Sequence, residues 1–217
     1  MAVDLIVVIL VIITGRIVPL FTRNALGDES IRMNAGINTA AIVSALLIAV
    51  VELFTSSGPV MAVVAGVAGL LVIARSIHWG FLKTLGNPIL WILHIGHAWI
   101  GAGLLLKAAS AASLRIPPSV ATHALTAGAI GTLTLGMMAR VTLGHTGRKI
   151  RASHLMTAGF FAISASALLR VLGPWLRIDL TKPVLIASGV CWSLAFAIYV
   201  VVNLRVLLTP RPDGKPG

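Results

Sequence analysis

The sequence predicts an all-α, polytopic membrane protein with seven transmembrane helices. Of its 217 residues, 58% are hydrophobic and only 11% are charged, and the mean hydropathy is +1.00. A soluble domain of this size needs a more charged surface to face water. The apolar runs are continuous and close to about twenty residues long, the length that crosses roughly 30 Å of hydrocarbon.

Residues that stop or start a helix mark four of the six connections between the predicted spans. The separators are Ser57-Gly58-Pro59, Gly86-Asn87-Pro88, Pro117-Pro118, Gly173-Pro174 and Lys182-Pro183. The predicted spans are 3–22, 35–54, 60–77, 89–108, 120–142, 153–172 and 183–207. Because the connections are short, neighbouring helices are antiparallel and residues 1–209 form one transmembrane domain. The tail 210–217, PRPDGKPG, is predicted to be disordered.

The basic residues predict the orientation in the membrane. Of the 17 Lys and Arg residues, twelve lie on the side of the membrane that holds the C-terminus and the connections that follow the first, third and fifth spans. The other five lie on the opposite side. Basic loops stay in the cytoplasm, so the N-terminus is predicted outside and the C-terminus inside. The first apolar run lacks a basic segment before it and is as long as a true span, which argues against a cleaved signal peptide. The net charge of +11 therefore indicates cytoplasmic loops and not a nucleic-acid partner.

Two histidines on the fourth predicted span are candidate ligands. His94 and His97 are three residues apart, which places both on one helix face with about 4.5 Å of rise between them. Ionisable side chains inside a membrane are costly and often functional, and neutral imidazole is a common metal ligand. The alternative is that each imidazole is hydrogen-bonded to a neighbouring helix. The single Cys191 excludes an internal disulfide and a thiolate metal cluster.

Two further histidines lie at opposite ends of the fifth predicted span. His123 is near its outer end and His145 follows its inner end. Twenty-two helical residues separate them, or roughly 33 Å, so they cannot bind one metal ion. If both are functional, they belong to two sites at different depths.

Arginines inside the predicted spans raise a question of charge balance. Arg16 lies in the first span and Arg140 near the end of the fifth, while Glu52 is the one carboxylate that we place within a span. An external anion, such as haem propionates or a small oxyanion, would balance the two guanidiniums. The alternative is that both side chains extend to the interface.

Small residues are frequent in spans three to five. They predict close helix packing in lipid, and the alternative is room for a flat cofactor. The glycines concerned are Gly66, Gly69, Gly101, Gly103, Gly128, Gly131 and Gly136.

Several segments together resemble the NnrS family of bacterial membrane proteins. They are His123-Ala124-Leu125-Thr126, Gly128-Ala129-Ile130-Gly131-Thr132, Arg140-Val141-Thr142-Leu143-Gly144-His145-Thr146-Gly147-Arg148, the run from Gly15 to Leu26 and the segment from Trp91 to Trp99. The resemblance implies a multi-pass protein of the bacterial inner membrane that associates with haem b and copper. It also implies a role in the nitric oxide and nitrosative-stress response of denitrifying and related bacteria.

The resemblance and the residues lead to a first hypothesis, that the protein binds haem and binds, senses or detoxifies nitric oxide. His94 or His97 would be an axial ligand, Arg16, Arg140 or Arg148 would neutralise propionates, and His123 or His145 would serve a second metal such as copper. One open axial position suits a diatomic ligand, whereas two axial histidines favour electron transfer.

Two alternatives remain open. One is a small anion or metal transporter or channel with Arg16 and Arg140 as charge selectors, and the other is a haem-free assembly subunit. Members of the family are usually longer, with a His-rich first half that nothing in this sequence matches. We therefore expect the chain to correspond to the C-terminal portion or to a short member. A homo-oligomer or partner helices would then replace the missing half.

Overall fold

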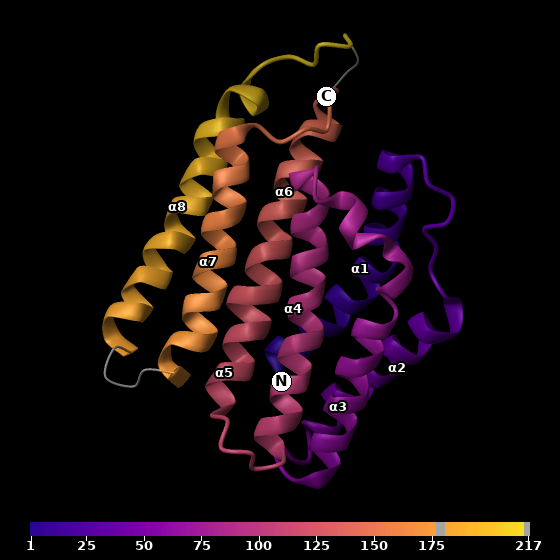
Figure 1. Ribbon diagram of the computed structural model, residues 1–217, viewed down its shortest axis with the longest axis vertical. Helices are drawn as coiled ribbons and strands as arrows, with labels where there is room; N and C mark the ends of the chain where they lie inside the picture. The colour runs from indigo at the N-terminus through magenta and orange to yellow at the C-terminus, as the bar shows by residue number, and fades with distance from the viewer. Residues whose placement is uncertain (177–180, 215–217) are drawn as a thin grey trace.

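The computed structural model describes residues 1–176 and 181–214 (Figure 1). Every regular element in these residues is helical, as the sequence predicts. The longer helices are α1 (Ala2–Leu26), α2 (Ala35–Val51), α3 (Pro59–Ala74), α4 (Pro88–Ala111), α6 (Thr132–His145), α7 (His154–Leu176) and α8 (Thr181–Leu208). The shorter ones are η1 (Ile77–Trp79), η2 (Phe81–Thr84), α5 (Pro118–His123) and η3 (Ala124–Gly131).

The described helices form seven rods that run alternately up and down the bundle, because α5, η3 and α6 are continuous (Figure 1). Six rods are long and apolar enough to cross a membrane. The exception is α2, an apolar helix of 17 residues, at the lower limit of about 17–25 residues for a span. The predicted boundaries therefore agree with the helices to within a few residues, and the predicted orientation stays a prediction.

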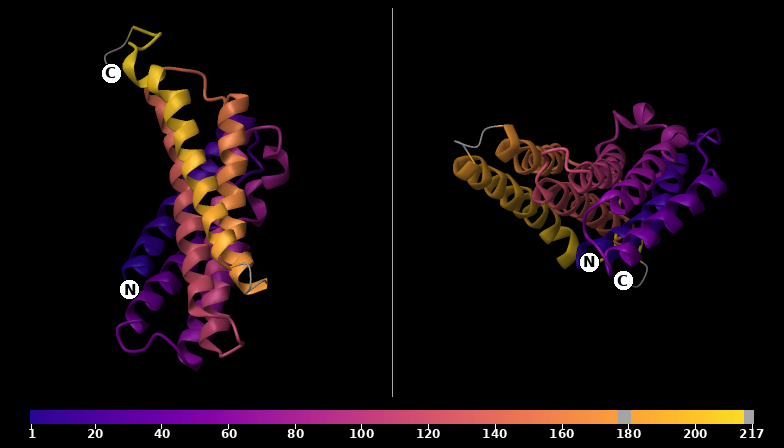
Figure 2. Two further views of the ribbon diagram at one scale, coloured as in Figure 1. Left: turned by 90° about the vertical axis from the view of Figure 1, so that its left-hand side faces the viewer. Right: turned by 90° about the horizontal axis from the view of Figure 1, so that it is seen from below.

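Helix α4 is the centre of the bundle. It packs against α1, α3 and the α5–η3–α6 rod. In its most apolar stretch of 18 residues 67% is buried inside the bundle, against 17% in that of α8. Viewed along the bundle, α8 and the α1–α3 group lie at opposite edges (Figure 2). The residues that the sequence singles out on α4 therefore lie in the interior, whereas α8 presents apolar side chains outward.

Glycines allow α4 to approach its neighbours closely. A Cβ added at Gly101 would lie 2.5 Å from Cγ1 of Ile73 on α3, and one added at Gly103 would lie 2.5 Å from Cδ2 of Leu125 on the fifth rod. The predicted close packing is thus present at these positions. Gly131 differs, because a Cβ added there would lie 3.4 Å from its nearest neighbour, Nε1 of Trp192.

The fifth rod contains a π-helical segment, η3, between two α-helical parts. The sequence predicts an uninterrupted helix over 120–142, so the π geometry is a departure from that expectation. Each turn of a π-helix holds more residues than an α-helical turn, and such segments often mark functional sites. Immediately after it, the buried hydroxyl of Thr132 has no hydrogen-bond partner within the described chain.

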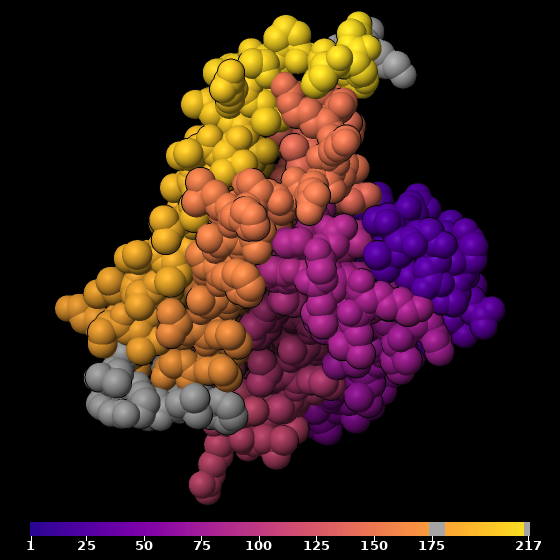
Figure 3. Space-filling model, turned by 45° about the horizontal axis from the view of Figure 1, so that its top comes forward, coloured from indigo at the N-terminus to yellow at the C-terminus, as the bar shows by residue number. Residues whose placement is uncertain are grey.

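A shallow apolar hollow separates α4 from α7 on the face shown in Figure 3. Trp99 of α4 and Ser164 of α7 are among its lining residues, and its volume is about 350 Å³. It carries one polar side chain and no ionisable one, so it is not the site that the histidines and arginines predict.

Candidate functional site

His97 is fully enclosed between three helices. Its Nε2 donates to the carbonyl oxygen of Val72 on α3 at 2.9 Å, and its Nδ1 lies 3.1 Å from Oγ1 of Thr14 on α1. The ring of Trp79 packs over the imidazole at a centroid distance of 4.5 Å. Because Nε2 is occupied by the Val72 carbonyl and Nδ1 is covered by the Thr14 hydroxyl, neither ring nitrogen of His97 is open to a metal.

His94 lies one turn earlier on the same face of α4, as the spacing predicts. Its Nε2 is 2.9 Å from Oγ1 of Thr22, whose hydroxyl donates to the carbonyl of Val18 at 2.8 Å. With that proton committed, Nε2 of His94 is the donor and Nδ1 carries the free lone pair. Nδ1 has no hydrogen-bond partner among the described residues, so His94 is better placed to bind a metal than His97.

A buried arginine that the sequence analysis did not select stands at the centre of this cluster. Arg75, at the end of α3, is only 2% exposed. Its Nη1 donates to the carbonyl of Val11 at 2.8 Å and to Oδ1 of Asn38 at 3.1 Å, and its Nη2 donates to Oγ1 of Thr14 at 3.1 Å. Arg75 falls inside the predicted span 60–77, so the criterion that selected Arg16 also applied to it.

Two buried N–H groups in the same cluster lack acceptors within the described chain. They are Nε of Arg75 and Nε1 of Trp79. The guanidinium carbon of Arg75 lies 5.6 Å from the centre of the Trp79 ring, so cation–π attraction supplies part of the missing stabilisation. The cluster is held by amide, hydroxyl and carbonyl oxygens and by an aromatic face.

Arg16 and Arg140, the two arginines that the sequence did select, lie in different surroundings. Arg140 is half-buried, and its guanidinium carbon is 3.8 Å from the ring centre of Phe21 on α1. Arg16 is exposed and lines a small pocket at the surface. Within residues 1–176 and 181–214, neither side chain forms a hydrogen bond or ion pair with Glu52, whose partners are Lys107 and the Met1 amino group.

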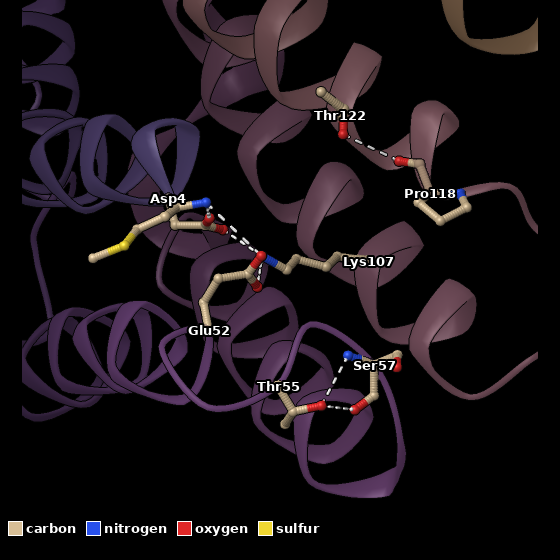
Figure 4. Close-up of polar contacts among 8 residues, drawn as sticks. Asp4, Glu52, Thr55, Ser57, Lys107, Pro118 and Thr122 are labelled. Atoms are coloured by element: carbon tan, nitrogen blue, oxygen red, sulfur yellow. Dashed lines mark hydrogen bonds and ion pairs between the residues drawn. The ribbon is translucent and has the colours of Figure 1, made fainter.

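Glu52 instead belongs to an ionic cluster at the opposite end of α1 (Figure 4). Nζ of Lys107 lies 2.5 Å from Oδ1 of Asp4 and 2.9 Å from Oε2 of Glu52. The amino group of Met1 is 2.9 Å from Oδ2 of Asp4. Asp4 is 5% exposed, so the bundle encloses a second carboxylate that the sequence analysis did not identify. Its position inside the predicted span 3–22 was the available signal.

His123 lines a cavity on the side of the bundle formed by the fifth rod, α7 and α8. The cavity has a volume of about 680 Å³ and lies between the η3–α6 part of the fifth rod, α7 and α8. Arg170 of α7 also lines it, and neither side chain has a hydrogen bond or ion pair within the described chain. The other lining residues are Thr126, Ala127, Ile130, Gly131, Thr134, Ser166, Ser188, Gly189, Trp192, Ser193 and Phe196.

The walls of this groove are fixed by contacts between α7 and α8. Ser166 and Ser188 exchange hydrogen bonds, each hydroxyl donating to the other's carbonyl oxygen at 2.9 Å. The rings of Trp192 and Phe196 lie 4.4 Å apart, centre to centre. Gly131 leaves the floor open on the η3 side. The groove is therefore a preformed, largely apolar slot with an imidazole and a guanidinium in its lining.

The segment from Gly144 to Arg148 lies at the other end of the fifth rod. His145 is exposed, and its carbonyl oxygen accepts a hydrogen bond from Nη1 of Arg211 at 2.7 Å. Nη2 of Arg148 donates to Oγ1 of Thr209 at 2.6 Å. This turn therefore contacts the beginning of the tail, and the predicted disorder of 210–217 stays a prediction.

The six histidines are distributed over several parts of the bundle. In the described residues, no group of three or more His, Cys, Asp and Glu side chains is placed to hold a metal ion. His94 and His97 come together, whereas His123 and His145 are at opposite ends of one rod, as the sequence predicts. The metal and cofactor roles of these residues, and of Arg16, Arg140 and Arg148, remain predictions.

The fold and these polar sites define a multi-pass helical membrane protein that encloses histidine and arginine side chains. A family model described as NnrS protein matches residues 1–211. The chain therefore belongs to the NnrS family, and membership suggests a membrane protein of the nitric oxide response. No curated protein and no solved structure matches the chain.

Proposed function

We propose that this protein binds haem b within the membrane and serves the nitric oxide response by binding, sensing or detoxifying the gas. The observation that carries the proposal is His123, an imidazole without a hydrogen-bond partner in the described chain, in the lining of the 680 Å³ groove. Arg170 in the same lining offers a charge for a carboxylate. Family membership supplies the link to nitric oxide.

The residues of the groove fit a tetrapyrrole. Its volume lies within the roughly 300–1,000 Å³ of ordinary ligand sites, and most of its exposed lining surface is apolar, as in such sites. The neutral imidazole of His123 can coordinate iron, and the guanidinium of Arg170 can pair with a propionate. Gly131 has no side chain to block the groove, and the indole ring of Trp192 gives it a flat side. Haem would supply an iron atom able to bind a diatomic gas.

The sequence-based choice of axial ligand, His94 or His97, is less well supported than His123. Both ring nitrogens of His97 are covered, one by the Val72 carbonyl and one by the Thr14 hydroxyl, whereas His94 keeps a free Nδ1. His94 is therefore the second candidate ligand, either for haem or for the proposed copper. His145 is on the surface, where it would serve copper only together with ligands from outside the described chain.

Haem content distinguishes these assignments. The full chain is expressed with adequate haem supply, purified in detergent and scored for its Soret band and pyridine haemochrome per protein. We expect His123→Ala to lose bound haem and Arg170→Gln to weaken its retention. The matched control His154→Ala changes an exposed histidine at the start of α7 and should keep the wild-type haem content. A haem-free wild type contradicts the proposal. Loss of haem in His94→Ala but not in His123→Ala would assign the haem site to α4 instead.

The alternative function, an anion or metal transporter, has one observation in its favour. Arg140 is half-buried and contacts the face of Phe21, a partner that leaves its charge unneutralised. Uptake of an anion such as nitrite into proteoliposomes, abolished in Arg140→Gln and in Arg16→Ala, would support transport over haem binding. Wild-type proteoliposomes that take up no anion or metal above empty vesicles would contradict it.

A further inference from the structure

A pocket lined by three arginines opens beside the C-terminal half of α1. It has a volume of about 330 Å³ and lies between α1 and the segment that connects α1 to α2. Arg16 and Arg23 are seven residues apart on α1, so they lie on the same face two turns from one another. Arg32 approaches from the connecting segment. The remaining lining residues are Pro19, Leu20, Ile31 and Met33.

The positive charge of this pocket is poorly balanced. Arg16 and Arg32 make no hydrogen bond or ion pair within the described chain. Arg23 is 4.0 Å from Oε2 of Glu29, whose side chain is 88% exposed, so that pair is weak. The other nearby carboxylate, Asp28, is already bound by Nζ of Lys83 at 2.5 Å. Three guanidiniums thus face the pocket with one distant carboxylate among them.

The rest of the pocket is apolar. Leu20 lies between Arg16 and Arg23 on the helix and is 41% exposed, and Met33 is equally exposed. Apolar side chains next to unpaired arginines, near the end of a membrane-spanning helix, match a ligand with a charged head and hydrocarbon chains. Basic pockets at membrane interfaces recognise phospholipid head groups in this manner.

The pocket is separate from the proposed haem groove. Asp4, at the start of α1, and Thr122, next to His123, line one common pocket at one end of the bundle. Arg16 is twelve residues further along α1, which is about 18 Å of helix rise. Arg16 therefore lines a different site from the groove at His123. We infer another role for it than the predicted neutralisation of propionates.

We propose that the pocket formed by Arg16, Arg23 and Arg32 binds the phosphate of an anionic phospholipid, with the acyl chains against Leu20 and Met33. Guanidiniums bind phosphate oxygens through paired, charge-assisted hydrogen bonds. Because the pocket is positively charged, it favours lipids with a net negative head group over zwitterionic lipids. The bound lipid would hold the α1–α2 connection against the bundle.

Native mass spectrometry of the full chain tests this proposal with defined lipids. Phosphatidylglycerol, phosphatidylcholine with the same acyl chains, and inorganic phosphate are each titrated onto the detergent-purified protein. We expect phosphatidylglycerol to bind in preference to phosphatidylcholine. The double variant Arg16→Gln/Arg32→Gln should bind it about tenfold more weakly or worse.

The control Lys149→Gln/Arg151→Gln removes the same charge from exposed residues between α6 and α7. It should bind phosphatidylglycerol like the wild type. Equal loss in this control, or equal binding of phosphatidylcholine, overturns the proposal. Inorganic phosphate that binds as tightly as the lipid and with the same dependence on Arg16 and Arg32 assigns the pocket to a free anion. If the double variant does not fold, Arg32→Gln alone is used, since Arg32 is outside the helices.

Discussion

His97 donates a hydrogen bond to the carbonyl oxygen of Val72 at 2.9 Å, which joins α4 to α3 in the middle of the bundle. The partner carbonyl belongs to the helix that carries Arg75, and the other ring nitrogen of His97 lies beside the Thr14 hydroxyl that Arg75 also contacts. The imidazole therefore acts as a link between three helices.

His97→Ala is expected to lower stability and leave haem binding intact. The substitution leaves the buried Val72 carbonyl without the imidazole donor, and an unsatisfied buried polar group costs about 1–3 kcal/mol. Thermal unfolding in detergent and haem per protein are measured on the same preparations. His123→Ala should show the opposite pattern, with haem lost and unfolding nearly unchanged. Loss of haem in a well-folded His97→Ala protein would contradict this assignment.

Gly15→Ala is expected to destabilise the cluster around Arg75. A Cβ at residue 15 would lie 2.3 Å from Oδ1 of Asn38 and 2.6 Å from Nη1 of Arg75, so both side chains must move. Overpacking of this kind costs about 1–3 kcal/mol, which would appear as a lower unfolding temperature. Gly189→Ala on α8 is the matched control, because a Cβ there meets nothing within 4 Å. Equal unfolding temperatures for the two variants would disprove the tight packing.

Lys107→Met is expected to destabilise the end of the bundle shown in Figure 4. The change leaves Asp4 and Glu52 without their shared cation, and breaking a buried pair costs about 3–5 kcal/mol. The lower end of that range applies, since the Met1 amino group stays near Asp4. Chemical unfolding in detergent measures the loss. Lys149→Met, in an exposed position, should have no effect, and an equally stable Lys107→Met protein would refute the prediction.

The Asp28–Lys83 ion pair is expected to give a pH-dependent contribution to stability. Hydrogen bonds from Lys83 and Ser30 lower the pKa of Asp28 from 3.8 to about 2. A lowered pKa in the folded state stabilises the protein above the unfolded value, and this contribution disappears as the pH falls from 3.8 to about 2. Unfolding temperatures of wild type and Asp28→Asn should differ at pH 6 and converge at the acid end. A difference that persists there would contradict the shift.

The helices were largely predictable because apolar length and helix-breaking residues determine where a chain crosses a membrane. The spans predicted at 60–77 and 89–108 correspond to Pro59–Ala74 and Pro88–Ala111, each beginning at a proline. The spacing of His94 and His97 also gave their common face correctly. The shortness of α2 was not predictable, because Leu53 and Phe54 continue its apolar pattern and yet lie in turns.

The environments of the charged residues could not be read from spacing along one helix. Arg75 and Lys107 fall near the ends of the predicted spans 60–77 and 89–108. Arg75 is nevertheless buried by residues from α1 and α2, and Lys107 by Asp4 and Glu52. That Arg170 and His123 line the same groove likewise depends on how α7 packs against the fifth rod. These contacts join residues far apart in the sequence, and no local pattern encodes them.

The π segment from Ala124 to Gly131 resets the helical phase of the fifth rod. A helix face that is counted in steps of 3.6 residues from His123 does not stay in register beyond Thr132. The two halves of the rod can therefore pack against different neighbours. Removing one residue within the segment would allow ordinary α-helical bonding and would rotate His123 relative to Arg140. A single-residue length change here would thus be mild for the helix and severe for the groove.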